Sequence, residues 1–577
     1  MIRPLRTSIG AKKLTTQANH VLQGIGDVKV ILPDHVLIPI LGGGLAPAVP
    51  GPAEPLYGPR QRANIQGNTI PGFNKDHQHF LFFRLGRLAS GKAWLQWIAP
   101  QITSLDEVLA FVRAHRALRF RLGVQEVDLC ATWVNIAFSH HAIAQLAGVH
   151  DADAFGDQSF RQGLGERSTY LGDPTRRQHR GHRSRWVVGG PRNEADILVI
   201  VAADDPEDLV EKVAEIKRRA AAARLRLLFE QRGDTLPGAL RGHEHFGFKD
   251  GVSQPGVRGK VSTAPGDFIT PRYLVAADSQ DNRPDIFAKP GQLLLWPGQF
   301  LLGEPRQHTE VIVPSAPGAT NFPAWAALGS YLVCRRLRQD VPAFWRFAIG
   351  AATALGIPPL QFGAMLVGRW PSGAPIMRTP AADNAALAGD PWANNQFIFD
   401  DDTRPSNLIP IPGYTGDGFA RAHGDFLGAV CPHFAHIRKT NPRDGGTDLG
   451  KPADTTDRMI LRRGIPFGRP IAGVRRPPPS LVNRERGLMF VCYGSTIEDQ
   501  FEFLTRRWAN SPIQPDFDGH DPIIGAHDVR GNRTRFIDVP TPAGARRIQI
   551  RRDFVIPTGG GYFFSPPIEA IAGVLGA

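Results

Sequence analysis

Three short stretches of the sequence contain residue types that could do chemistry. The first is Gly247-Phe248-Lys249-Asp250-Gly251, where a carboxylate lies between glycines on a turn that could bring the backbone close to a flat ligand. This pattern is weak by itself, because a chain with 62 glycines contains a G-x-x-D-G by chance roughly once in three cases. An ordinary Asp-Gly turn is therefore the alternative.

The second stretch runs from Cys431 to Arg443 and reads CPHFAHIRKTNPR. A neutral imidazole is a good axial ligand for haem iron, and neighbouring cations could neutralise haem propionates. Both His433 and His436 could be that ligand. A histidine in a basic loop is more often a solvated surface residue, so this alternative stays open as well.

The third stretch is Arg462-Arg463-Gly464-Ile465-Pro466-Phe467. A guanidinium fixed beside apolar residues could stabilise negative charge on a departing oxygen. The same residues read equally well as the basic end of a strand.

The elements around these stretches predict an α+β protein. In the first half, short apolar runs predict strands at 79–85, 127–138, 197–202 and 225–229. Helices are predicted to begin at the capping box Ser104–Glu107 and at Asp205-Pro206. A β-α-β order that occurs twice fits a ferredoxin-like unit with an antiparallel sheet.

A similar order returns in the second half, with strands predicted at 330–337 and 487–493, another ending at 562–564, and helices from about 341 and from Ser495. We therefore expect an N-terminal extension (1–62), a ferredoxin-like domain that carries the GxxDG motif (63–285) and a second ferredoxin-like domain (286–577). The segments 150–193, 371–428 and 509–556 are rich in Pro, Gly, Asp and Arg, and we predict long loops there.

Composition narrows the class of protein. The net charge of +13 comes mainly from scattered arginines, without a helix-turn-helix, zinc-finger, RRM or KH pattern, so no nucleic-acid partner is expected. Four distant cysteines without C-x-x-C-H predict that any haem is held without covalent thioether bonds. We see no signal peptide or membrane span, so we expect a cytoplasmic protein without a membrane partner, and export stays open.

Taken together and in this order, the three stretches resemble the dye-decolourising peroxidase family. The resemblance extends to other motifs spread over residues 64 to 567, most of the chain. They are Asn64-Ile-Gln-Gly-Asn68, Gly72-Phe-Asn-Lys-Asp-His77, Trp133-Val-Asn-Ile-Ala-Phe-Ser-His140, Val252-Ser-Gln-Pro255, Pro297–Gly303, Gly329–Leu337, Gly487-Leu-Met-Phe490, Gln500-Phe-Glu-Phe503 and Gly559-Gly-Gly-Tyr-Phe-Phe564.

This resemblance implies two ferredoxin-like domains with haem b in the C-terminal one. By position, His436 resembles the iron ligand, Asp250 the acid–base that serves peroxide, and Arg462 the arginine beside it. Cofactor contacts are implied at four further positions: Leu488 and Phe490 over the haem face, and Arg438 and Arg443 as propionate partners.

The implied function is a peroxidase that reduces hydrogen peroxide and oxidises organic donors such as dyes and phenolics by one-electron steps. A haem-binding or iron-releasing protein on the same scaffold, with little turnover, is the alternative. A model aspartate titrates near ~3.9 and a histidine near ~6.5, so the base form of Asp250 should survive to lower pH, and we predict an acidic optimum. The natural donor and the oligomeric state stay open. Tyr493, beside the Leu488–Phe490 strand, is one candidate relay for electrons from large donors.

Overall fold

The structure of the protein is a computed structural model. It describes residues 54–122, 129–249, 251–264, 266–272, 287–307, 320–391, 393–400, 419, 424–450, 452–471, 485–526 and 534–577. The predicted strand at 127–138 is described from residue 129, and there it begins at Thr132.

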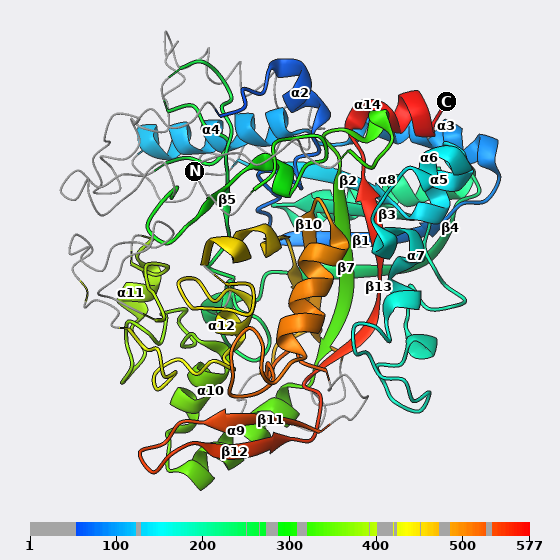
Figure 1. The fold of residues 1–577 in the computed structure, drawn as a ribbon. Helices are drawn as coiled ribbons and strands as arrows, with labels where there is room; N and C mark the ends of the chain where they lie inside the picture. The colour runs from blue at the N-terminus through cyan, green and yellow to red at the C-terminus, as the bar shows by residue number, and fades with distance from the viewer. Residues whose placement is uncertain are drawn as a thin grey trace.

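Nine strands form one antiparallel sheet at the centre of the molecule (Figure 1). They are β1 (His77–Arg84), β2 (Thr132–Phe138), β3 (Ile197–Ala203), β4 (Arg226–Asp234), β7 (Ser330–Gln339), β8 (Leu461–Arg462), β9 (Ile465–Phe467), β10 (Gly487–Gly494) and β13 (Val555–Ser565). Their order is β4-β1-β3-β2-β13-β7-β10-β8, with β9 also paired to β10. Counted within each half of the chain, this is the 4-1-3-2 order of a ferredoxin-like unit, once for β1–β4 and once for β7, β8/β9, β10 and β13. The predicted fold class is confirmed.

The two units join into a curled sheet. At the seam, β2 and β13 pair through Phe138 and Phe564. At the other side, β4 packs against β9. The approach is so close at Gly233 that a Cβ atom built there would lie 2.5 Å from the Cγ2 atom of Ile465. The sheet therefore closes on itself far enough for its two end regions to meet.

The described helices are α2 (Pro59–Asn64), α3 (Leu88–Ile98), α4 (Leu105–Leu122), α5 (His140–Leu146), α6 (Val149–Asp153), α7 (Gln158–Arg167), α8 (Pro206–Ala222), α9 (Val341–Leu355), α10 (Pro359–Val367), α11 (Ala385–Gly389), α12 (His436–Thr440) and α14 (Ile568–Ala570). The helices predicted from Ser104, from Asp205-Pro206 and from about 341 are formed as α4, α8 and α9, whereas α7 and α11 lie in segments predicted as long loops. The capping box at α4 is formed, since the Ser104 amide donates to the Glu107 carboxylate and the Glu107 amide donates to the Ser104 hydroxyl. Asp205 caps α8 by accepting from two backbone amides.

The helix predicted from Ser495 differs in two ways. It is π-helical over Ile497–Glu502 and Leu504–Ala509, and Thr496 is its N-cap. The start lies one residue later because the distant Asp157 carboxylate accepts from the Thr496 hydroxyl and from the first helical amides. One apolar face of this helix, made of Ile497, Phe501, Leu504 and Trp508, is buried.

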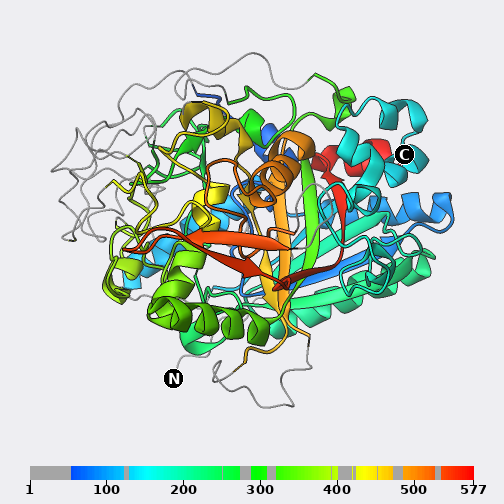
Figure 2. The ribbon, with the colours of Figure 1, turned by 60° about the horizontal axis from the view of Figure 1, so that its bottom comes forward.

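The segments predicted as loops contain short elements of their own. The segment 509–556 contains a hairpin of β11 (Arg535–Val539) and β12 (Arg546–Ile550), which packs beside α9 (Figures 1 and 2). Two short parallel strands, β5 (Gly256–Val257) and β6 (Leu294–Leu295), form a further pair. Among the described residues no single helix has the length and apolarity to cross a membrane; α9 and α10 meet that test only as a pair bent by 114°.

Packed structure reaches back into the predicted N-terminal extension as far as Glu54. The Glu54 carboxylate forms buried ion pairs with Arg258 and Arg272. Tyr57 is buried as well, and its hydroxyl donates to Glu304. Residues 54–62 are therefore packed against the fold.

Candidate active site

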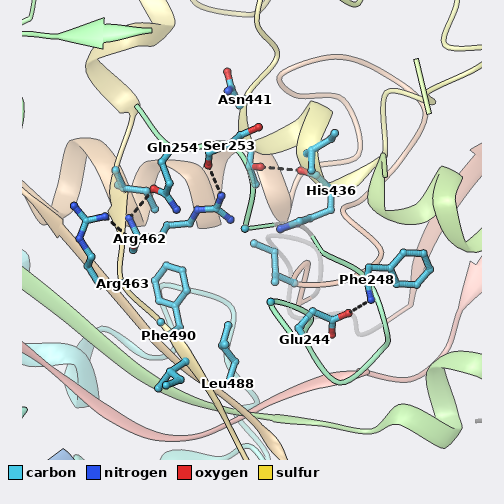
Figure 3. A pocket seen from close by; sticks show the side chains of 18 of the residues that line it. Glu244, Phe248, Ser253, Gln254, His436, Asn441, Arg462, Arg463, Leu488 and Phe490 are labelled. Atoms are coloured by element: carbon cyan, nitrogen blue, oxygen red, sulfur yellow. Dashed lines mark hydrogen bonds between the residues drawn. The ribbon is translucent and has the colours of Figure 1, made fainter. Parts of the chain in front are cut away.

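A cavity of about 670 Å³ lies between α12, the face of β10 that carries Leu488 and Phe490, and the segment 251–255 (Figure 3). All three chemistry-bearing stretches of the sequence reach it. Phe248 and Gly251 come from the first, His436 and Arg443 from the second, and Arg462 and Arg463 from the third. The fold thus brings together residues that are more than two hundred positions apart.

His436 is the first residue of α12, and its ring is oriented by a buried carboxylate. Its Nδ1 atom lies 2.7 Å from Oδ2 of Asp521. The other Asp521 oxygen accepts hydrogen bonds from the Ile523 and Ile524 amides, at 2.8 and 3.0 Å. Burial by itself would raise the pKa of Asp521, but the charge and hydrogen bond of His436 and the two amides outweigh it and lower this pKa below its ordinary value.

The other candidate histidine, His433, has a different environment. Its Nδ1 atom lies 2.7 Å from the Asp518 carboxylate, and its Nε2 atom lies 3.0 Å from the Phe426 carbonyl oxygen. The residues that line the cavity include His436 and not His433. Of the two, only His436 is placed to meet a ligand in the cavity.

Strand pairing positions the Arg462 side of the cavity. Arg462 lies on β8 opposite Cys492 of β10, and its guanidinium donates to the Ser253 carbonyl at 2.6 Å. Along β10, Leu488 and Phe490 are half-buried and line the cavity, whereas the alternate residues Met489 and Val491 are buried in the core behind the sheet. Figure 3 shows Arg462, Leu488 and Phe490 around the same space as His436.

The neighbouring Arg463 is held by the backbone. Its guanidinium donates to the carbonyl groups of Asn68, Thr69 and Pro71. Burial lowers the pKa of Arg463 to about 10. These contacts fix the turn that precedes Phe73 and occupy the Arg463 guanidinium. Arg462 is therefore the arginine of this pair whose side chain extends along the cavity wall.

Arg443 lines the cavity and lies beside a second arginine, Arg369. Its guanidinium donates to Asn395 Oδ1 at 2.7 Å and to the carbonyl oxygens of Asn395 and Phe397, and it stacks 3.7 Å from the Phe397 ring centroid. Arg369, which is fully buried, also donates to Asn395 Oδ1 and to the Ser253 hydroxyl. Burial lowers the pKa of Arg443 to about 10. Within the described ranges, no carboxylate lies within ion-pair distance of Arg443.

Arg438 is placed differently from its expected role as a propionate partner. It is buried, it forms an ion pair of 2.8 Å with Asp400, and it donates to the Asp425 and Cys431 carbonyl oxygens. It does not line the cavity. Because its side chain crosses beneath the loop that precedes α12, it fixes that loop, and we do not include it among the proposed cofactor contacts.

Asp250 lies outside the described residues, so its expected role stays a prediction. Its neighbours Phe248 and Gly251 line the cavity, and the Phe248 amide donates to the Glu244 carboxylate. The suggested relay Tyr493 is fully buried and hydrogen-bonded to Asn68 and Asn135. It has no exposed surface on which a large donor could dock.

Sequence reasoning missed three residues of the site. Asp521 lies 85 positions from His436, in a segment predicted only as a loop; the Asp521-Pro522 dipeptide signals a turn but no chemistry. Asn395 and Arg369 lie outside every motif singled out. Their roles depend on contacts between distant loops, and neither spacing nor composition reports such contacts.

Two family models match this chain. The "DyP dimeric alpha+beta barrel domain" matches residues 64–235, and "Dyp-type peroxidase, C-terminal" matches residues 406–516. A dye-decolorizing peroxidase of Exidia glandulosa is 31% identical over 98% of this chain and 96% of its own length. The chain belongs to the dye-decolorizing peroxidase family.

Other relatives agree with this membership. A dye-decolorizing peroxidase of Mycena epipterygia is 32% identical and covers 89% of the chain. Among solved structures, an ancestral D-type dye-decolorizing peroxidase is 32% identical with a TM-score of 0.68, and the match covers 89% of this chain and 99% of that one. The peroxidase of Auricularia auricula-judae gives 28% identity and a TM-score of 0.64 over 89% of this chain.

Proposed function

We propose that this family member is a haem peroxidase that reduces hydrogen peroxide and oxidises organic donors such as dyes and phenolics. The observation that carries the proposal is the cavity itself. In it, a histidine oriented by a buried carboxylate shares one space with an arginine and with two apolar side chains of the sheet.

Haem b, bound without covalent bonds, fits the residues present. A volume of about 670 Å³ is in the range of cofactor pockets, and Leu488 and Phe490 offer an apolar surface to a flat macrocycle. The guanidinium of Arg443 is half-buried without a described carboxylate partner, which is an environment that a propionate would complement. The chain has no C-x-x-C-H motif for covalent attachment.

His436 would hold the iron through Nε2, because Nδ1 is directed to Asp521. The hydrogen bond to the carboxylate fixes the tautomer and the ring plane and makes the imidazole a stronger donor. When bound, haem supplies the redox chemistry by which the peroxide bond is cleaved and electrons are taken from the donor.

The other residues would handle protons and charge. Asp250 would take a proton from one oxygen of peroxide and deliver it to the other, so that water leaves. Arg462 would stabilise the negative charge that develops on the departing oxygen. Leu488 and Phe490 would keep bulk water away from that exchange, and Arg443, with the Ser253 hydroxyl and Asn395 beside it, would bind a propionate.

We propose a cytoplasmic location and no nucleic-acid or membrane partner, on the sequence features given above. Cell fractionation with antibody detection tests the location, and retention on heparin with and without bound haem tests the absence of a nucleic-acid role. Retention at physiological salt that does not depend on haem would contradict the latter.

An absorption spectrum of the purified protein, before and after peroxide, tests the central proposal. We expect a Soret band, its rapid change on mixing with peroxide, and recovery when a dye is added, with an acidic optimum for dye oxidation. Asp250→Ala should retain haem and slow the peroxide-dependent change, whereas the adjacent Lys249→Ala should behave as the unmodified protein. A protein that binds haem but shows no change with peroxide would instead support the haem-binding alternative.

A further inference from the structure

Three side chains around α12 bind one loop of the chain. His433, His436 and Lys439 are spaced three residues apart, and each contacts a residue of the segment 509–521. We call this segment the 509–521 loop. Its two ends meet where the Asp521 amide donates to the Ala509 carbonyl at 3.0 Å, so Asp521 lies at the neck of a closed loop.

Lys439 binds the first part of the loop. Its side chain is fully buried, and its ammonium donates to the carbonyl oxygens of Ser511 and Gln514 at 2.8 and 2.5 Å. Because these carbonyls lie three residues apart in the loop, one ammonium fixes both the position and the direction of the chain there.

His433 binds the middle of the loop. Its ring lies 2.7 Å from the Asp518 carboxylate and 3.4 Å from that of Asp516. The loop is thus held by Lys439 at its beginning, by His433 in its middle and by His436 at Asp521. The three contacts leave little freedom for the carboxylate that meets Nδ1 of His436.

Burial of the Lys439 ammonium is unfavourable, so packing alone does not account for a lysine at this position. Burial lowers its pKa to about 8, although Asp521 and the carboxylates at 516, 518 and 448 oppose that shift. A folded-state pKa below the unfolded value means that the charged form is destabilised in the fold, and stability rises with pH between about 8 and the unfolded value near ~10.4. An unbranched apolar side chain would fill the same space without this cost.

We propose that Lys439 is a positioning residue: by holding the 509–521 loop against α12, with His433 as the second contact, it fixes the Asp521 carboxylate on His436. This inference rests on the proposed function, because it assigns His436 as the iron ligand. It goes beyond that function by assigning the geometry of the ligand to a residue that does not line the cavity.

The test is Lys439→Met, which keeps the stem and removes the ammonium. The matched control is Lys92→Met, since the Lys92 ammonium also donates to a backbone carbonyl, at Ala577, remote from the cavity. Two readouts are measured: the iron–histidine stretching band of the reduced haem protein, and solvent exchange of the His436 Nδ1 proton in the full-length haem-free chain labelled with ¹⁵N-histidine.

We expect Lys439→Met to broaden and lower the iron–histidine band and to speed proton exchange about tenfold, as the loss of charge-assisted hydrogen bonds implies. Lys439→Arg, which keeps charge and donors, should recover most of the change, and Lys92→Met should change neither readout. If Lys439→Met does not fold, Asp518→Asn removes the charge from the His433 contact instead and should shift both readouts in the same direction.

An unchanged band and unchanged exchange in both Lys439→Met and Asp518→Asn would overturn the inference. Failure of the proposed function has a different signature. In that case the unmodified protein shows no iron–histidine band at all, while proton exchange in the haem-free chain still reports whether Lys439 fixes the His436–Asp521 contact.

Discussion

The His436 wall and the Arg462 wall of the cavity are built in different ways. The His436 wall is assembled from α12 and the 509–521 loop, which lie far apart in sequence and are joined by ionic and charge-assisted contacts. The Arg462 wall is assembled from β8 and β10, where backbone pairing and alternation place the side chains. One wall depends on a few strong polar contacts, and the other on the regular geometry of a sheet. Single substitutions should therefore affect the two walls differently.

The largest difference is expected at His436 itself. His436→Ala removes the proposed iron ligand and leaves the buried Asp521 carboxylate without the group that contributes most to lowering its pKa. We expect haem to be lost during purification while the sheet stays folded. The haem-to-protein ratio and the far-ultraviolet circular dichroism measure these two effects. His433→Ala removes the other candidate histidine and one contact of the 509–521 loop but leaves the proposed ligand, so it should retain most of the haem; equal retention in both variants would refute the assignment.

The counterpart on the other wall is Arg462→Leu. Arg462 is held by strand pairing, so its truncation should leave haem in place and slow the reaction with peroxide by roughly 10²–10³-fold, as for other groups that stabilise developing charge. Stopped-flow absorbance against peroxide concentration gives the rate. The exposed Arg469→Leu should be neutral. Loss of haem from Arg462→Leu would show that the two walls are less independent than their contacts indicate.

The contrast between the walls also explains how much could be predicted from sequence. The strands and the two ferredoxin-like units follow from short apolar runs and their order, which is local information, whereas Leu488 and Phe490 were expected at the site from the family resemblance. His436 and Arg462 were found through motifs of the family. Asp521 and Lys439 act through contacts across more than seventy residues, and local patterns contain no record of them. Arg438 shows that a motif can also mislead. It lies in a motif of the family, but its guanidinium pairs with Asp400 and donates to two carbonyl oxygens instead of facing the cavity.

A smaller effect is expected from Asp521→Asn, which keeps the shape of the side chain and removes its charge. The amide oxygen can still accept from Nδ1, so haem should bind with affinity reduced by about 10–100-fold, as for other groups that orient a metal-bound histidine. Haem transfer to an excess of an apoglobin measures this change. Asp538→Asn, on the β11–β12 hairpin where the Asp538 carboxylate pairs with Arg547, is the control. Unchanged affinity would mean that the ring is oriented by packing alone.

The last contrast between the two walls is their response to pH. His245, just before the GxxDG motif, is buried with its Nε2 atom 2.8 Å from the Phe467 carbonyl of β9. Burial, reinforced by Arg486, lowers its pKa to about 4 despite this hydrogen bond. Its Nδ1 atom has no hydrogen-bond partner among the described residues, so a second proton there would have no acceptor.

The direction in which stability changes with pH follows from the protons that the folded and unfolded chains bind at His245. Between pH ~6.5 and about 4 the unfolded chain binds a proton at His245 and the folded chain does not, so the free energy of unfolding falls with decreasing pH by up to about 3 kcal/mol. Asp521 has the same sign in a lower window: because its pKa is lowered in the fold, its contribution is complete above the ordinary carboxylate value near ~3.9 and is lost as the pH falls below that value. In urea titrations across pH 4–7, His245→Gln should lose less stability on acidification than the unmodified protein does. A parallel pH dependence for the two proteins would place the acid-sensitive group elsewhere, and the Arg462 wall would then be as acid-resistant as the His436 wall.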